Sequence, residues 1–336
     1  MSGSRVPRPS SQDVADRVGV SRATVSAYLN KTRYVSPGLS ERIQLAIDEL
    51  GYVPDPVARA LKTSDTSTVG LIIPVMTSFY MPMINAIERE AASRGYELLI
   101  SSSNEDRVKE RELLDVLVAK RVTGIVITPC SDENSERINA ILRSGVPVAQ
   151  VNRRLEGVDA DSVVSDNFRA AYQATEHLVR RGSRRIAFLG YDESNIANLR
   201  KKLGYEAAVR DLGVAEGLVI AVREHDRDLI TARLEAFIDG GNRFDALIAT
   251  TQGKTVIALR TLVRRGYRVP EDVALIGFDD TPWCELLSPP LTMISEDTST
   301  MGAESLALLI GRIEGSMDGP ARHVVLEDRM IIRLSA

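Results

Sequence analysis

The sequence predicts a small all-α head joined to a larger body of two α/β lobes with parallel sheets. Near the N-terminus, apolar residues recur at helical spacing over residues 10–52. From residue 69 onward, short β-branched runs alternate with amphipathic stretches, a pattern typical of parallel strands covered by helices on both faces. This second pattern continues for roughly 270 residues, which is more than one core usually organises, so we expect two lobes.

Three short helices account for the head. The first is expected over 12–18, and Gly19 ends it in the left-handed conformation that glycine favours. A second is expected over 22–30, and Gly51 ends the third. The residues that can cap their N-termini are Ser10 or Ser11 for the first helix, Ser21 for the second, and Ser36 or Ser40 for the third.

A linker with two prolines and a Ser/Thr run follows at 53–67. In the body the expected strands are 69–73, 97–101, 124–128, 147–151, 162–165, 185–189, 218–222, 246–249 and 273–277. The expected helices include 82–94, 105–119, 167–181 and 254–265. Because ligands of open α/β sheets bind beyond the carboxyl ends of the strands, the loops after these runs are the candidate site.

The composition argues against several classes of protein. No segment reaches the ~20 apolar residues that span a bilayer, and residues 1–10 lack the apolar core of a secretory signal. The 2 cysteines and 3 histidines are too scattered for a disulfide framework or a metal site. We therefore expect a cytoplasmic protein that needs no metal and no cofactor.

Charge is divided unevenly along the chain. Residues 1–63 contain nine basic and six acidic residues, a net charge of +3, whereas the whole chain carries −4. A basic head on an acidic body suits contact with a polyanion such as nucleic acid. A solvated basic surface would give the same count, so charge alone does not decide.

The sequence contains no complete enzymatic motif. Gln252-Gly253-Lys254-Thr255 resembles the end of a phosphate-binding Walker A loop, but that motif needs glycine at position 248, where this chain has Ile248. Neither GxSxG nor GxGxxG occurs. We expect no catalytic residues and a body that binds ligands without being an enzyme.

The strongest local pattern lies in residues 12–30. Small Ala15 lets two helices cross closely, and Gly19 makes the turn between them. The residues expected on the outer face of the second helix are Arg22, Ala23, Ser26, Ala27 and Asn30. This face carries no acid and suits a helix that lies in a DNA major groove. An ordinary pair of antiparallel helices is the simpler alternative.

A resemblance extends from this segment over nearly the whole chain. It includes Glu49-Leu50-Gly51-Tyr52, Ala58-Arg59-Ala60-Leu61, Val69-Gly70-Leu71-Ile72-Ile73-Pro74, Arg121-Val122-Thr123-Gly124-Ile125, Val269-Pro270-Glu271-Asp272-Val273 and Gly277-Phe278-Asp279-Asp280. The chain resembles the lactose/galactose repressor (LacI/GalR) family. The resemblance implies a helix-turn-helix head, a hinge helix, and a two-lobed body like a type I periplasmic binding protein.

The resemblance also implies domain boundaries. The expected ranges are 10–53 for the DNA-binding head, 54–67 for the hinge helix and linker, and 68–336 for the effector-binding and dimerisation body. Within the body, the N-terminal lobe is expected at 68–165 and 295–323, and the C-terminal lobe at 166–294 and 324–336.

Double-stranded operator DNA with a pseudo-palindromic sequence is the implied partner of a dimer. Arg22 is expected to read a guanine edge, and Ala23 a thymine methyl. The positions that match phosphate contacts, which place the helix without reading sequence, are Ser21, Thr24, Ser26 and Asn30. Ala27 stands where many members carry arginine, so we expect an operator that departs from the family's usual central motif.

The implied hinge helix orders on DNA and inserts a leucine into the minor groove. Leu61 is that residue by position, and Ala58 is small enough for a close approach. Burial of Leu61 against the body is the alternative.

In the body, the positions that match effector contacts are Ser78, Tyr80, Asn152, Arg153, Lys201, Thr250, Asp279 and Glu296. Asn152 and Thr250 favour a sugar or polyol, whose hydroxyls need donors and acceptors together. Arg153 and Lys201, with Arg200 beside them, instead favour a phosphorylated or carboxylated ligand. Any of these residues could also be a structural polar group.

Together these expectations describe a transcriptional regulator, most simply a repressor. Its operator affinity would be controlled by a sugar, polyol or sugar phosphate bound between the lobes, and it would act as a homodimer or higher oligomer away from membranes. The alternative is a cytoplasmic small-molecule-binding or enzymatic α/β protein with a vestigial DNA-binding head.

Overall fold

The structure is a computed structural model that describes residues 9–30, 33–52, 67–191, 196–214, 216–222 and 226–336. The chain divides into two compact units, residues 1–66 and 67–336. Most of the expected hinge, with Ala58 and Leu61, lies outside the described residues. No helix in the described part of the chain is long and apolar enough to cross a bilayer.

The head contains α1 (Ser11–Val18), α2 (Arg22–Asn30) and α3 (Pro37–Leu50). Ser10 caps α1 through a capping box, in which its hydroxyl accepts from the Asp13 N–H and the Asp13 carboxylate accepts from the Ser10 N–H at 2.7 Å. Gly19 ends α1 at a φ of +74°, where glycine avoids the strain that a side chain would cause. The helix ends predicted at Gly19 and Gly51 are therefore confirmed.

A small apolar core holds these three helices together. Its fully or nearly fully buried members are Val14, Ala15, Val18, Val25, Ile43 and Ala46. The Ser21 hydroxyl accepts from the Thr24 N–H at 3.2 Å and so begins α2. The head thus presents α2 on a compact support.

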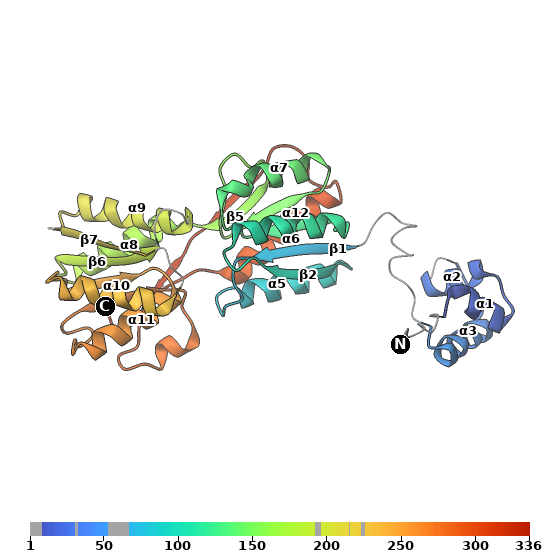
Figure 1. The fold of residues 1–336 in the computed structure, drawn as a ribbon, viewed down its shortest axis with the longest axis horizontal. Coiled ribbons are helices and arrows are strands. Elements are labelled where there is room, and N and C mark those ends of the chain that lie inside the picture. The colour runs from blue at the N-terminus through green and yellow to red at the C-terminus, as the bar shows by residue number, and fades with distance from the viewer. Residues whose placement is uncertain (1–8, 31–32, 53–66, 192–195, 215, 223–225) are drawn as a thin grey trace, which may run out of the picture. The chain divides into compact units, whose positions relative to one another are not determined.

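The N-terminal lobe of the body is built on a parallel sheet with the strand order β11-β5-β4-β3-β1-β2. Its strands are β1 (Thr68–Ile73), β2 (Glu97–Ser102), β3 (Gly124–Ile127), β4 (Val148–Val151), β5 (Asp161–Ser165) and β11 (His323–Leu326). The helices are α5 (Met81–Ser93) and α12 (Thr298–Ile313) on one face, and α6 (Arg107–Ala119) and α7 (Ser135–Arg143) on the other. Figure 1 shows the helices of this lobe arranged around its sheet.

The C-terminal lobe repeats this architecture with the strand order β12-β10-β9-β8-β6-β7. Its strands are β6 (Arg185–Tyr191), β7 (Glu216–Val222), β8 (Ala246–Ala249), β9 (Ala274–Phe278), β10 (Thr292–Ser295) and β12 (Arg329–Ile331). The covering helices are α8 (Asn167–Arg180) and α9 (Ile196–Asp211) on one face, and α10 (Arg227–Asp239) and α11 (Gln252–Arg264) on the other. Two 3-10 turns, η1 (Asp132–Asn134) and η2 (Pro282–Glu285), complete the body.

Three segments cross between the lobes, and the expected lobe boundaries were wrong at two of them. Residues 324–326 were assigned to the C-terminal lobe, but β11 pairs with β5 in the N-terminal sheet. Ser295 was assigned to the N-terminal lobe, but it ends β10 and pairs with Arg329. Strand pairing decides both cases, because each segment stays hydrogen-bonded in its sheet to the end of its strand before it crosses.

One strand also departs from the expected parallel arrangement. β12 runs antiparallel to β10, whereas every other strand pair in the two sheets is parallel. The chain reaches β12 directly from the N-terminal lobe and enters the sheet at the carboxyl end of β10. It must therefore run in the opposite direction.

Candidate functional site

Buried polar side chains gather where the strands of both lobes end. Asn152 follows β4, Thr250 follows β8 and Asp279 follows β9, while Lys201 lies on α9 and Glu296 on a crossing segment. All five are buried. Polar groups remain at such depth only when they find partners, so their hydrogen bonds define the site.

Glu296 is the centre of this network. Its Oε1 accepts from Lys201 Nζ at 3.1 Å, and its Oε2 accepts from Asn152 Nδ2 and from Ser165 Oγ, each at 3.3 Å. Lys201 belongs to the C-terminal lobe, and Asn152 and Ser165 to the N-terminal lobe. A single carboxylate therefore collects bonds from both lobes.

Lys201 is held by several groups besides Glu296. Its Nζ donates to the Thr250 carbonyl at 3.3 Å and lies 4.3 Å from the centre of the Phe278 ring. Burial lowers the pKa of the Lys201 amine, but the negative charges of Glu296 and Asp279 outweigh this effect and hold it above its usual value. Lys201 is therefore a buried ammonium ion.

Arg153 forms the second buried ion pair of the cleft. Its two terminal nitrogens donate to both carboxylate oxygens of Glu105, at 2.8 and 2.6 Å. This parallel pair of bonds is the geometry that guanidinium and carboxylate groups prefer. Nη1 also lies 3.4 Å from the Pro129 carbonyl. The fork of Arg153 is thus occupied by the chain's own residues.

A hydrogen bond across the cleft involves Ser78 and Gln252. Ser78, from the loop after β1, donates to Gln252 Oε1 at 2.8 Å at the start of α11. The Gln252 N–H in turn donates to Asp279 Oδ2 at 2.9 Å. Burial raises the pKa of Asp279 to about 6, and Lys201 opposes this rise. The two lobes are therefore linked directly at one edge of the cleft.

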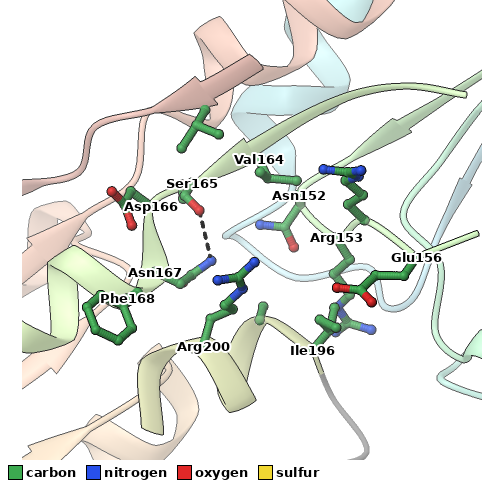
Figure 2. Close-up of a pocket in the computed structure, with 13 residues that line it drawn as sticks. Asn152, Arg153, Glu156, Val164, Ser165, Asp166, Asn167, Phe168, Ile196 and Arg200 are labelled. Atoms are coloured by element: carbon green, nitrogen blue, oxygen red, sulfur yellow. Dashed lines mark hydrogen bonds between the residues drawn. The ribbon is translucent and has the colours of Figure 1, made fainter. Parts of the chain in front are cut away.

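Two cavities flank the network. Figure 2 shows the first, of about 300 Å³, where Asn152, Ser165, Asn167 and Arg200 converge from the two lobes. The second, of about 510 Å³, is lined by hydroxyl and carboxyl groups that include Ser78, Asp279 and Glu296. Cavities of about 300–1,000 Å³ are the usual size for small-ligand sites.

In the head, α2 presents a polar face. Ser21, Arg22 and Ala23 are exposed, and Thr24 and Ser26 are half-buried. Arg22 Nε donates to the Ser11 hydroxyl at 3.0 Å, so its guanidinium lies beside the start of α1. The side chain of Asn30 lies outside the described residues.

The comparisons with known proteins cover both units. Residues 11–55 match the bacterial regulatory proteins of the lacI family, and residues 66–328 match the periplasmic binding proteins and sugar binding domain of the LacI family. The chain belongs to the LacI family. It is a DNA-binding transcriptional regulator with a ligand-binding regulatory body, and the relatives described below are regulators and not enzymes.

Two LacI-family relatives are similar over most of the chain. The HTH-type transcriptional regulator CelR of Thermobifida fusca is 32% identical over 339 residues, which cover 98% of this chain and 98% of that protein. The HTH-type transcriptional repressor PurR of Vibrio atlanticus (strain LGP32) is 30% identical over 306 residues, which cover 90% and 91%.

Solved structures of the LacI family share the fold. The lac repressor dimer bound to operator and the anti-inducer ONPF has a TM-score of 0.85 at 22% identity, over 98% of this chain and 99% of that chain. A complex of the transcriptional regulator CelR with cellobiose has a TM-score of 0.74 at 29% identity, over 98% and 100%.

Some positions inferred from the LacI-family resemblance behave differently from the expectation. Ala27 was expected to face outward, but it is 6% exposed, so that prediction is wrong. Its side chain is a single methyl group close to the backbone, which neighbouring side chains cover easily. Tyr80 is buried in the N-terminal lobe, and its hydroxyl lies 3.4 Å from Asn152 Oδ1. The Thr250 hydroxyl donates to Asn198 Oδ1 at 2.8 Å.

Sequence reasoning missed several residues of the cleft. Glu105, Asn167, Phe168 and Gln252 all follow strand ends, which is the place where ligand contacts were expected. The exposed Phe168 is the aromatic wall of the first cavity. Their position after β2, β5 and β8 could have identified them as candidate site residues, but their residue types matched no motif.

Proposed function

We propose that this chain is a cytoplasmic repressor that binds a pseudo-palindromic operator as a dimer and is controlled by a small carbohydrate-like effector in the cleft of its body. The proposal is supported by relatives whose names include a transcriptional repressor, and by a neighbouring structure that holds cellobiose. The lac repressor structure is a dimer on operator DNA. A regulator of transcription must reach the chromosome, which supports the proposed cytoplasmic location.

The observation that carries the effector part is the hydrogen-bond network of Glu296. This carboxylate and the Ser78–Gln252 bond join groups from both lobes. A ligand that forms further bonds to these groups from both lobes favours one arrangement of the lobes over another. Such a ligand shifts the population of lobe arrangements by its difference in affinity for them, which is the basis of effector control.

The DNA part depends on α2. Arg22 and Ala23 begin the helix and are exposed, so they are the proposed base-reading residues. Ser21, Thr24, Ser26 and Asn30 are the proposed phosphate contacts. We retain Ala58 and Leu61 as the proposed minor-groove contacts of the hinge.

The test of DNA binding is selection of sites from random-sequence DNA, followed by a mobility shift on the selected site. We expect an inverted repeat, and binding that weakens steeply as salt rises because phosphate contacts release counterions. Deletion of residues 1–62 should abolish the shift. Selection of no common sequence, or binding that survives this deletion, would refute the proposal.

The test of effector binding is a thermal-shift screen of sugars, polyols and sugar phosphates, followed by operator release. The Asp279→Ala variant should lose the response to the compound found and keep operator binding. Asp272→Ala is the matched control, because Asp272 pairs with Arg268 on the surface at 2.8 Å. A full response from Asp279→Ala would remove this residue from the site.

A further inference from the structure

We propose that the cleft selects uncharged polyhydroxylated effectors over phosphorylated or carboxylated ones, because Lys201 and Arg153, the buried cations that an anion would use, are each paired with a carboxylate of the chain. This inference rests on the proposed effector function and narrows its ligand class. It decides between the two ligand types that the sequence left open.

The Lys201–Glu296 pair makes the first argument. The two side chains are 5% and 2% exposed, and their charged atoms are 3.1 Å apart. An anionic ligand that took the Lys201 ammonium would leave the Glu296 carboxylate buried without its counter-charge. Removing one partner of a buried pair is strongly unfavourable, whereas leaving the pair intact costs a neutral ligand nothing.

The Arg153–Glu105 pair makes the second argument. Arginine binds phosphate and carboxylate groups through its planar fork. Here both terminal nitrogens of Arg153 already bind Glu105, and the two side chains are 9% and 12% exposed. A phosphate would have to displace this carboxylate.

Further carboxyl groups lie near the two pairs. Burial and, next to it, the negative charge of Glu296 raise the pKa of Asp328 to about 8. Asp328 therefore holds its proton at neutral pH, and the buried charges of the two ion pairs balance. An anionic ligand therefore finds no unpaired cation in these two pairs.

The first cavity still offers neutral hydrogen-bonding groups. Asn152, Ser165 and Asn167 line it, and Phe168 supplies an aromatic surface. Amide and hydroxyl groups both donate and accept, which suits the hydroxyls of a polyol. Arg154 and Arg200 also line this cavity, as do the carboxylates of Glu156 and Asp166; Figure 2 shows Arg200 there. Both arginines are exposed, so water and salt weaken their attraction for an anion.

The experiment compares ligands that differ in one charged group. Full-length protein is titrated by calorimetry with the sugar found in the screen and with its phosphate and its uronate. Glucose, glucose 6-phosphate and glucuronate are the set if glucose is found. We expect the neutral member to bind at least about tenfold more tightly than each charged member, as for one uncompensated charge. A charged member that binds as tightly as its neutral parent overturns the inference.

Two variants test the cause of this selectivity. Glu296→Gln keeps the side-chain shape and leaves Lys201 without its carboxylate, so the ratio of anionic to neutral affinity should rise at least about tenfold. Lys201→Met combined with Glu296→Gln removes both charges and should return the ratio to that of the wild type. Asp272→Asn, on the surface, should leave the ratio unchanged. An unchanged ratio in Glu296→Gln would overturn the role of this pair.

The proposed function and this inference fail in different ways. If no carbohydrate binds or changes operator release, the effector proposal itself is wrong. If a sugar phosphate or a uronate proves to be the tight ligand and releases the operator, the effector proposal stands and the selectivity inference is wrong.

Discussion

At the scale of single residues, the cleft shows how one carboxylate organises many contacts. Glu296 receives an ammonium, an amide and a hydroxyl from three different elements. A glutamine at this position could accept at one oxygen only and would donate through its nitrogen. The negative charge at Glu296 therefore specifies a cation opposite, and Lys201 supplies it.

Asp328 provides a pH-dependent prediction at this scale. Its pKa is raised to about 8 in the folded body, mainly by burial, against about 3.9 in an unfolded chain. Between these pH values the folded state binds a proton that the unfolded state lacks. The free energy of unfolding therefore falls as pH rises, and it levels off above pH 8. Asp328→Asn binds no proton and should remove up to about 1.4 kcal/mol per pH unit from this slope.

The measurement is the urea midpoint of wild type and Asp328→Asn at pH 5, 6, 7 and 8. Asp272→Asn is the control, because the Arg268 guanidinium holds the pKa of Asp272 at about 2 and its titration lies below this range. Equal slopes in wild type and Asp328→Asn would show that Asp328 carries no proton in the folded state.

Individual site residues were partly predictable from the sequence. Asp279 and Asn152 were predicted from the resemblance to the LacI family, and both lie at strand ends in the cleft. The pairing of Arg153 with Glu105 could not, because 48 positions separate them and only the packed loops bring them together. The sequence favoured an anionic ligand because Arg153 and Lys201 were considered as isolated positive charges. Their carboxylate partners, Glu105 and Glu296, remove that reason.

At the scale of secondary-structure elements, α8 and α9 pack unusually closely at Gly204. A Cβ at this position would lie 2.0 Å from the Phe168 carbonyl oxygen. Gly204→Ala must therefore push the helices apart, which should cost about 1–3 kcal/mol of unfolding free energy. Effector affinity should also fall, because Phe168 lines the first cavity and Lys201 lies one turn from Gly204.

Urea unfolding and calorimetric titration measure these two effects. Gly253→Ala is the matched control, since nothing lies within 4 Å of an added Cβ on this glycine of α11. Alanine is the better helix former, so this control should be neutral or slightly stabilising. Gly204→Ala with the stability of the wild type would mean that the two helices are further apart than described.

The recognition helix α2 gives a second prediction at this scale. Arg22→Ala should weaken operator binding by about 1–3 kcal/mol and relax base preference at one position of each half-site. Arg17→Ala removes the same charge from α1, but Arg17 is paired with Glu49 at 2.8 Å, so its effect should be much smaller. Binding-site selection with each variant checks both expectations. A uniform loss across sequences for Arg22→Ala would reassign Arg22 to phosphate contact.

The elements themselves were predictable where local signals were strong. Gly19 and Gly51 fixed the ends of two helices, and the β-branched runs gave the central strands. The edge strands β11 and β12 are four and three residues long and carry no local signal of their own. The sheet that each of them joins depends on pairing with a strand that is distant in the sequence, β5 for β11 and β10 for β12. This explains why the lobe boundary near residue 324 was misplaced.

At the scale of the whole molecule, three crossing segments connect two independently packed lobes. They run from β5 to α8, from β10 to α12 and from β11 to β12. Glu296 and Asp328 both lie on these segments. A ligand that alters the Glu296 network therefore acts where the chain bends between lobes, so a small local change can alter their arrangement.

The division into two compact units leads to the last prediction. Because residues 67–336 form a unit of their own, an effector that binds the cleft should stabilise the body and leave the head unchanged. At a ligand concentration 100 times Kd, the body should gain about 2.7 kcal/mol. Differential scanning calorimetry of the full chain, and of the chain lacking residues 1–62, measures this with the carbohydrate found in the screen. The same upward shift of the body transition is expected in both proteins, with no shift in the head transition of the full chain. A shift that disappears in the truncated protein would place part of the effector site outside the body and would contradict the cleft described around Glu296.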